Sequence, residues 1–260
     1  MLQAGLVSVT FRALPPEEIV KLVAKAGLEG IEWGGDVHVP PGDTAIAKQV
    51  RSITVDAGLQ VASYGSYFRA GEDDAKVRHA VLHTALLLQA PTIRIWAGRR
   101  GSANADASYR QKVVADSRAL AEEAAAEGIT VSFEFHPNTL TDTLDSTLTL
   151  LDEVNSNNIY TYWQPPGDID FPSRLAGLEA VFPRLSNVHV MHHVPGKGRL
   201  PLADASDDWL NYLRPVAKSA NKHWAMIEFV PDNSPDIFQD EARTLLSWVD
   251  KIQAELNAGD

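Results

Sequence analysis

The 260-residue sequence contains no cysteine. A disulfide framework and a thiolate metal site are therefore excluded. No apolar run approaches the roughly 20 residues that a membrane-spanning helix needs. Residues 1–11 lack the basic stretch and the long apolar stretch of a signal peptide. From these absences we expect a cytoplasmic protein with no membrane partner.

Positive charge is scarce, with 23 Lys and Arg residues against 34 Asp and Glu residues, a formal net charge of −11. An acidic surface repels the phosphate backbone, so we expect no nucleic-acid partner. The densest basic stretch comprises Arg94, Arg99, Arg100 and Arg110. That stretch is compatible with local contacts to an anion or a sugar, and equally with a solvated loop followed by a helix face.

Short apolar runs alternate with longer segments of helical periodicity from end to end. The runs predict eight strands at 5–11, 30–33, 60–64, 92–96, 130–135, 159–163, 188–191 and 224–229. The periodic segments predict eight helices at 16–26, 44–57, 73–89, 107–127, 143–153, 173–182, 208–219 and 235–256. Eight strand–helix units in a chain of this length favour the α/β class. They predict a single (β/α)8 TIM barrel domain spanning residues 1–260.

Four polar residues occupy equivalent places near the ends of the last four predicted strands: Glu134, Gln164, His189 and Glu228. A charged group in a buried strand is costly unless it is paired or bound to a metal. The carboxyl ends of barrel strands meet at one face, where such barrels carry their chemistry. A lone histidine in a strand is more often a hydrogen-bonded core residue, but four matched positions favour one convergent site. Two carboxylates, an imidazole and an amide oxygen suit a divalent cation.

Several short phrases, taken in order, resemble the xylose-isomerase-like barrel superfamily, which contains sugar-phosphate isomerase and epimerase homologues. They are Gly30-Ile31-Glu32-Trp33, Phe133-Glu134-Phe135-His136, Tyr162-Trp163-Gln164-Pro165-Pro166, Val188-His189-Val190 and Ile227-Glu228. The resemblance covers nearly the whole chain. It is more specific for fold and metal site than for substrate.

The resemblance implies one divalent metal ion held by Glu, Asp, His and Glu from strands five to eight. Glu134, His189 and Glu228 match this set, whereas Gln164 stands where the family usually has Asp. The exchange removes one negative charge, which lowers the expected metal affinity and leaves the ion a stronger Lewis acid. Mn²⁺ is the favoured ion, and Mg²⁺, Co²⁺ and Zn²⁺ are compatible.

By the same resemblance, the chain is a metal-dependent sugar isomerase or epimerase. Glu134 and Glu228 would bind the ion and move protons beside the metal-bound carbonyl of a keto sugar or polyol. His136, two residues after Glu134, is a further catalytic candidate, with a locally bonded loop histidine as the alternative. The usual lysine of strand seven is absent. This absence keeps open a lyase on the same scaffold, either a keto-inositol dehydratase or an enzyme that cleaves 3-keto-glycosides.

Four residues are candidates for contact with a small carbohydrate substrate: Trp96, Trp163, His38 and Arg199. Ordinary core or rim packing is the alternative for the tryptophans, and a solvated loop for Arg199. Glu32 could orient the substrate or form a buried ion pair with Arg94, and we slightly favour the ion pair.

Relatives of this kind often form homo-oligomers. A repair endonuclease on the same fold is disfavoured because the ligands of a three-zinc cluster are missing. A sugar-binding protein without metal is a non-enzymatic alternative.

Overall fold

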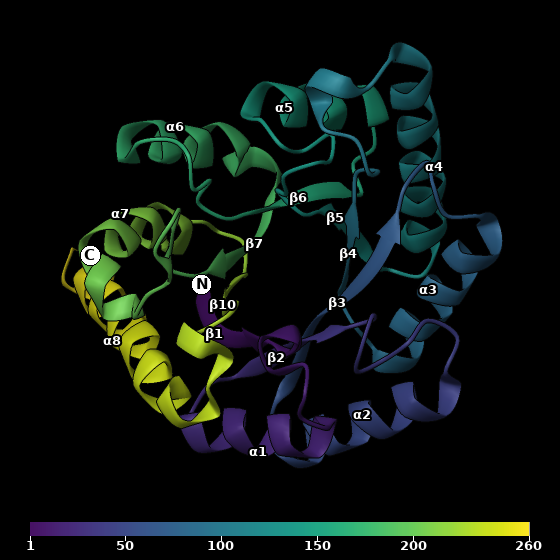
Figure 1. Cartoon of the computed structure of the whole chain (residues 1–260). Coiled ribbons are helices and arrows are strands. Elements are labelled where there is room, and N and C mark those ends of the chain that lie inside the picture. Colours follow the sequence, from purple (N-terminus) through teal and green to yellow (C-terminus); the bar gives the residue numbers. More distant parts are fainter. Residues whose placement is uncertain (260) are drawn as a thin grey trace.

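Eight parallel strands close into a barrel, seen along its axis in Figure 1. The computed structural model describes residues 1–259, so Asp260, the last residue of the predicted domain, lies outside it. The strands of the barrel are β1 (Leu2–Val7), β2 (Gly30–Gly34), β3 (Gln60–Arg69), β4 (Thr92–Trp96), β5 (Thr130–Phe133), β6 (Ile159–Trp163), β7 (Leu185–Val190) and β10 (His223–Ile227). They follow one another around the barrel in chain order, and β10 pairs with β1 to close it. The predicted (β/α)8 barrel is confirmed.

Eight α-helices surround the barrel in Figure 1. They are α1 (Pro16–Ala26), α2 (Thr44–Asp56), α3 (Ala75–Leu88), α4 (Ala107–Ala126), α5 (Leu144–Val154), α6 (Phe171–Val181), α7 (Ser206–Ala217) and α8 (Pro235–Gly259). An aspartate or threonine side chain caps the N-terminus of five of them, at Asp43, Asp74, Asp106, Thr143 and Asp170. Such caps satisfy backbone N–H groups that the first turn leaves free. Among the described residues, no helix has both the length and the apolarity to cross a membrane.

Apolar residues form two separate clusters. The larger lies between the strands and the surrounding helices, and the smaller fills part of the barrel interior with Tyr162, Trp224 and Met226 among its members. Gly30 leaves room for the Trp224 ring, because a Cβ atom at Gly30 would lie 2.6 Å from it. The interior therefore combines this apolar cluster with the polar groups described below.

Several bounds differ from the prediction, and the third strand continues to Arg69 instead of ending at residue 64. The first strand ends at Val7 instead of continuing to Phe11, and Ser8–Phe11 forms a 3₁₀ helix. In this 3₁₀ helix, Thr10 Oγ1 accepts a hydrogen bond from the backbone N–H of Phe229, which follows β10. In addition, a short hairpin of β8 (His193–Val194) and β9 (Gly198–Arg199) lies in the loop between β7 and α7, where no strands were expected.

Candidate metal centre and active site

The four predicted ligands come together at the carboxyl ends of β5, β6, β7 and β10. His189 lies within β7, and the other three directly follow their strands. The backbone N–H groups of Glu134 and Glu228 still donate to carbonyls of the adjacent strands, at 3.0 and 2.9 Å. This pairing carries the strand geometry one residue further, so both side chains keep the inward direction that strand alternation gives them.

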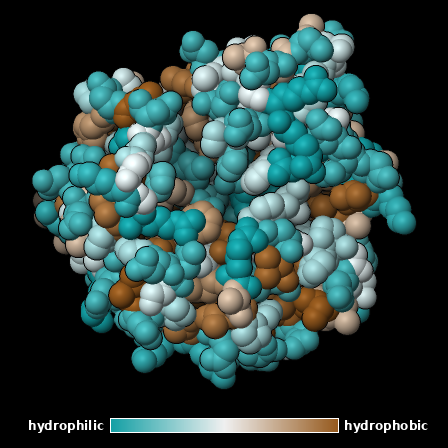
Figure 2. Space-filling model, in the orientation of Figure 1, coloured by the Kyte–Doolittle hydropathy of each residue, from teal (hydrophilic) through white to brown (hydrophobic). Residues whose placement is uncertain are grey.

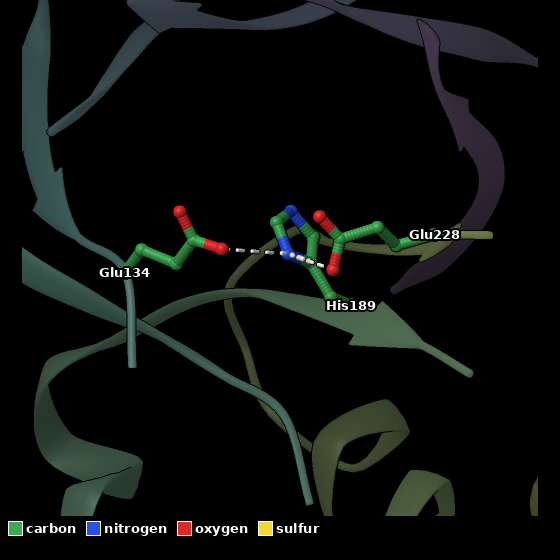
Figure 3. A group of neighbouring side chains, drawn as sticks. All are labelled: Glu134, His189 and Glu228. Carbon is green, nitrogen blue, oxygen red and sulfur yellow. Dashed lines mark ion pairs between the residues drawn. The ribbon is translucent and has the colours of Figure 1, made fainter. Parts of the chain in front are cut away.

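The side chains of Glu134 and Glu228 extend toward His189 from opposite sides (Figure 3). One potential ligand atom from each of these buried residues lies within 4.8 Å of the others. His189 Nδ1 is 3.3 Å from Glu228 Oε2 and 4.0 Å from Glu134 Oε1. Gln164 Oε1 lies 3.2 Å from the same nitrogen, because Gln164 Nε2 donates to the Phe135 carbonyl at 2.6 Å and turns its oxygen inward.

Further buried charged groups, Glu32 and Arg94, lie on the Nε2 side of His189. Glu32 Oε1 lies 3.5 Å from His189 Nε2 and accepts a hydrogen bond from Arg94 Nε at 2.7 Å. Ser63 donates to the other oxygen of Glu32 at 2.7 Å. The buried Glu32–Arg94 ion pair, one of the two alternatives for Glu32, is thus present. A carboxylate beside Nε2 leaves Nδ1 as the nitrogen available to a metal.

The charges of the site control its protonation. Burial alone would lower the pKa of His189, but the carboxylates of Glu228 and Glu32 outweigh it and raise that pKa to about 10. Burial would likewise raise the pKa of Glu228, but nearby His189 and then Arg94 lower it. In the absence of an ion, the carboxylates are therefore compensated by the protonated imidazole and by Arg94.

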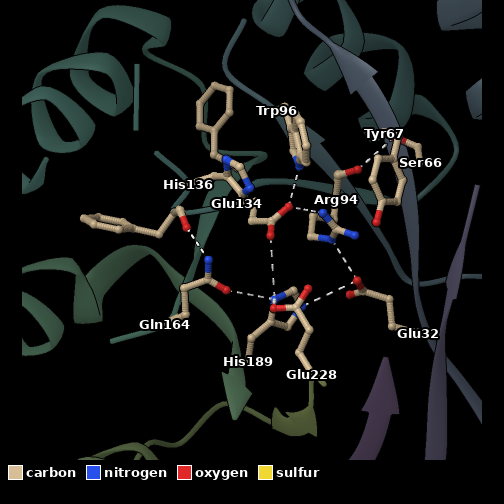
Figure 4. A network of polar contacts seen from close by, with 12 residues as sticks. Glu32, Ser66, Tyr67, Arg94, Trp96, Glu134, His136, Gln164, His189 and Glu228 are labelled. Atoms are coloured by element: carbon tan, nitrogen blue, oxygen red, sulfur yellow. Dashed lines mark hydrogen bonds and ion pairs between the residues drawn. The ribbon is translucent and has the colours of Figure 1, made fainter. Parts of the chain in front are cut away.

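Glu134 is held by two donors that the sequence pattern did not connect with it. Arg94 Nη1 and Trp96 Nε1 both donate to Glu134 Oε2. Residues 94 and 96 are two apart on β4, so strand alternation predicts that both side chains point into the barrel. The sequence does not indicate which way the indole N–H points. Trp96 was predicted as a substrate contact, and its hydrogen bond to Glu134 was not predicted (Figure 4).

A cavity of about 720 Å³ lies above these residues, where the molecular surface is hollowed in Figure 2. Its walls include Glu134, Glu228, Trp96 and His136. The His136 ring stacks on Trp96 with 4.4 Å between ring centroids. His136 Nδ1 lies 2.7 Å from the Pro137 carbonyl oxygen and donates to it, which leaves Nε2 as the nitrogen available to a ligand in the cavity.

The other predicted substrate contacts lie apart from the cavity wall. Trp163 is 1% exposed and packs between the barrel and α7, against Trp209 and Tyr212. Its predicted substrate contact does not fit this position, because inward and outward side chains alternate along β6 and residue 163 points outward. His38 is also buried, with Nδ1 3.0 Å from Ser8 Oγ, and it too does not reach the cavity.

Arg199 lies on the hairpin after β7. Its guanidinium stacks 3.8 Å from the centre of the Phe229 ring and donates to Asn233. Phe229 lines the cavity and Arg199 does not. The predicted contact between Arg199 and the substrate therefore stays a prediction.

The donor set fits a divalent cation. Two carboxylate oxygens, an amide oxygen and an imidazole nitrogen converge in one buried place, which is the combination that Mn²⁺ and similar ions accept in proteins. Replacement of the proton on His189 by a divalent ion would keep the buried charge compensated. The structure thus contains a buried Glu134, His189 and Glu228 group that can hold a metal.

Comparison with known proteins identifies the family of this barrel. The family model described as xylose isomerase-like TIM barrel matches residues 20–167. A 3-dehydroshikimate dehydratase of Bacillus anthracis is 26% identical over 254 residues, which cover 88% of this chain and 90% of that protein.

Two solved structures share the fold. A crystal structure of a probable 3-DHS dehydratase from Bacillus anthracis has a TM-score of 0.78 at 24% identity, and the match covers 95% of this chain and 99% of that chain. A D-allulose 3-epimerase from Methylomonas sp. has a TM-score of 0.71 at 17% identity, covering 96% and 98%. At such identities these two structures establish the fold alone.

Proposed function

The chain belongs to the xylose isomerase-like TIM barrel family, and on that premise we propose that it is a metal-dependent lyase. In this proposal it removes a proton next to a ketone of a polyhydroxylated small molecule and expels water or another group from the neighbouring carbon. The observation that carries the proposal is the convergence of Glu134, Gln164 and Glu228 on His189 Nδ1 at the floor of the cavity.

The metal would be held by Glu134 Oε1, Gln164 Oε1, His189 Nδ1 and Glu228, with Mn²⁺ as the proposed ion. When bound, it would supply a positive charge that stabilises the enolate formed as the proton leaves. The site is deep and buried, which makes such charge stabilisation stronger than it would be in water.

Glu228 and His136 provide the proton transfers. Glu228 reaches the cavity and takes the proton from the C–H bond next to the ketone. The electrons of that bond form a carbon–carbon double bond as the hydroxyl on the next carbon departs. His136 faces the same cavity and, in its protonated form, gives the departing hydroxyl a proton so that water leaves.

We propose elimination before isomerisation because of a relative that aligns with most of this chain. That relative, at 26% identity, is named a dehydratase. Its substrate name suggests 3-dehydroshikimate as the first compound to test. The sequence favours an isomerase with a lyase as the alternative, and the name of this relative supports the lyase at least as well.

An epimerase is the second candidate, and one observation favours it. Glu134 and Glu228 approach the centre from opposite sides (Figure 3). Such an arrangement suits removal of a proton from one face of a carbon and its return on the other.

One experiment separates the two candidates. The purified protein with Mn²⁺ is incubated in D₂O with 3-dehydroshikimate, keto-inositols, 3-keto-glycosides and keto sugars, and the products are followed by NMR. Loss of water or of an aglycone identifies the lyase. Deuterium incorporation without loss of a group identifies the epimerase and rejects the lyase. If no member of the panel changes although the protein binds Mn²⁺, both proposals fail for these substrate classes.

A further inference from the structure

The two glutamates of the proposed metal centre have different surroundings. Glu134 Oε2 accepts hydrogen bonds from Arg94 Nη1 and Trp96 Nε1. Glu228 accepts no hydrogen bond from Arg94 or Trp96, and its Oε2 lies 3.3 Å from Nδ1 of His189, which is itself a proposed ligand. The carboxylates therefore differ in how many oxygen atoms are free, although the sequence pattern makes them look equivalent.

Arg94 is itself fixed. It is 1% exposed, and its Nε donates to Glu32 at 2.7 Å, so the guanidinium cannot swing away from Glu134 without breaking a second buried ion pair. Gly65 gives it room, since a Cβ atom at Gly65 would lie 2.6 Å from Arg94 Nη2 and 2.9 Å from Glu32 Oε1. The fixed arginine therefore restricts the position of Glu134 Oε2.

Trp96 restricts the position of the same oxygen atom, Glu134 Oε2. Its indole is stacked on one side by His136, and the Arg69 guanidinium lies 3.6 Å from the ring centre. Tyr67 packs at 5.5 Å between ring centroids. Three neighbours thus hold the ring in the plane that points its N–H at Glu134 Oε2.

We propose, on the basis of the proposed metal centre, that Trp96 is a positioning residue for the metal. Together with Arg94 it occupies Oε2 of Glu134, so that this glutamate presents only Oε1 to the ion. Glu228 keeps an oxygen free of protein donors and is the carboxylate left to meet the substrate. Trp96 is at the same time part of the cavity wall, so the surface that meets the substrate also orients a metal ligand.

The test uses the full-length protein without substrate. Trp96→Phe keeps an aromatic ring in the wall but removes the N–H donor. Removal of such an outer partner typically weakens metal binding by about 10–100-fold, and we expect a loss of at least about 10-fold in Mn²⁺ affinity by calorimetry. With Co²⁺ bound, the visible absorption bands should change, because Glu134 Oε2 then keeps only the Arg94 hydrogen bond and the orientation of this carboxylate at the ion is less constrained.

Trp248→Phe is the matched control. It also removes an indole donor, one that bonds Ser206 at 3.2 Å on the helical side of the molecule, and it should leave both readouts unchanged. If the wild-type protein binds Mn²⁺ and Trp96→Phe binds it equally well with the same Co²⁺ spectrum, the positioning role is refuted and the proposed function stands. If the wild-type protein binds no divalent ion, the proposed function fails and the positioning role fails with it.

Discussion

Glu32 Oε1 lies 3.5 Å from Nε2 of His189, on the side of the imidazole that faces away from the three other ligand candidates. Partners of this kind fix the tautomer of a metal-binding histidine and increase its basicity. We therefore expect Glu32 to affect the proposed metal centre although it is not among the proposed ligands.

Glu32→Gln should weaken Mn²⁺ binding by about 10–100-fold. It should also lower the free energy of unfolding, because Arg94 loses one of its two buried carboxylate partners. Calorimetric titration and urea unfolding measure the two effects. Glu122→Gln, which changes an exposed glutamate on α4, is the control and should change neither the affinity for Mn²⁺ nor the Arg94 ion pairs. Unaltered Mn²⁺ affinity in Glu32→Gln would argue that His189 needs no such support.

Glu228→Gln should reduce turnover by at least about 100-fold at saturating Mn²⁺, since a positioned base typically contributes a factor of about 10²–10⁴. The amide keeps an oxygen for the ion but cannot accept the substrate proton. The circular dichroism spectrum should stay that of the wild type. Glu241→Gln changes a buried glutamate outside the cavity wall and should retain activity. Near-normal turnover of Glu228→Gln would remove this residue from the mechanism.

Gln164 offers a direct test of how ligand charge sets metal affinity. Gln164→Asp and Gln164→Asn are the same size and both shorten the side chain, so both lose the reach that gives Gln164 its bond to the Phe135 carbonyl. They differ only in charge. We expect the Asp variant to bind Mn²⁺ at least about 10-fold more tightly than the Asn variant, which corresponds to a difference in binding free energy of about 1.4 kcal/mol. Equal affinities would mean that residue 164 does not approach the ion.

Metal binding should depend on pH. With a pKa of about 10 in the ion-free protein, His189 is protonated at neutral pH, and an ion must displace that proton. The logarithm of the apparent Mn²⁺ affinity should therefore rise by about one per pH unit between pH 6.5 and pH 9. Calorimetry in buffers of different ionisation enthalpy counts the released proton. An affinity that stays flat over this range would show that His189 is neutral without the ion.

The same shift has a consequence for the ion-free protein. The folded state holds a proton on His189 up to about pH 10, whereas an unfolded histidine loses it near pH 6.5. The contribution of this group to stability is thus fully present below pH 6.5 and is lost as the pH rises toward 10. Urea unfolding of metal-free protein at pH 6.5 and pH 9 should show lower stability at the higher pH.

The barrel and its polar floor were predictable because both follow from local patterns. A carboxylate at the end of an apolar run is expensive to bury, so Glu134 and Glu228 could be recognised as a pair from their positions alone. Strand alternation then places such residues on the inner face. The same alternation along β6 turns Trp163 outward, where it packs against Trp209 and Tyr212.

Other features depend on tertiary contacts that no local pattern encodes. The indole of Trp96 meets Glu134 only because β4 and β5 pair in one particular register. His38 is held away from the cavity by Ser8, a residue 30 positions earlier. Which oxygen of a carboxylate is free, and which nitrogen of a histidine faces a ligand, are likewise decided by neighbours from other strands.

The most direct test of the metal centre is anomalous diffraction from crystals grown with Mn²⁺. The account predicts a single anomalous peak within roughly 2.0–2.5 Å of oxygen atoms of Glu134, Gln164 and Glu228 and of His189 Nδ1. Crystals that show those side chains with no peak among them, or with Mn²⁺ bound only elsewhere on the chain, would contradict it.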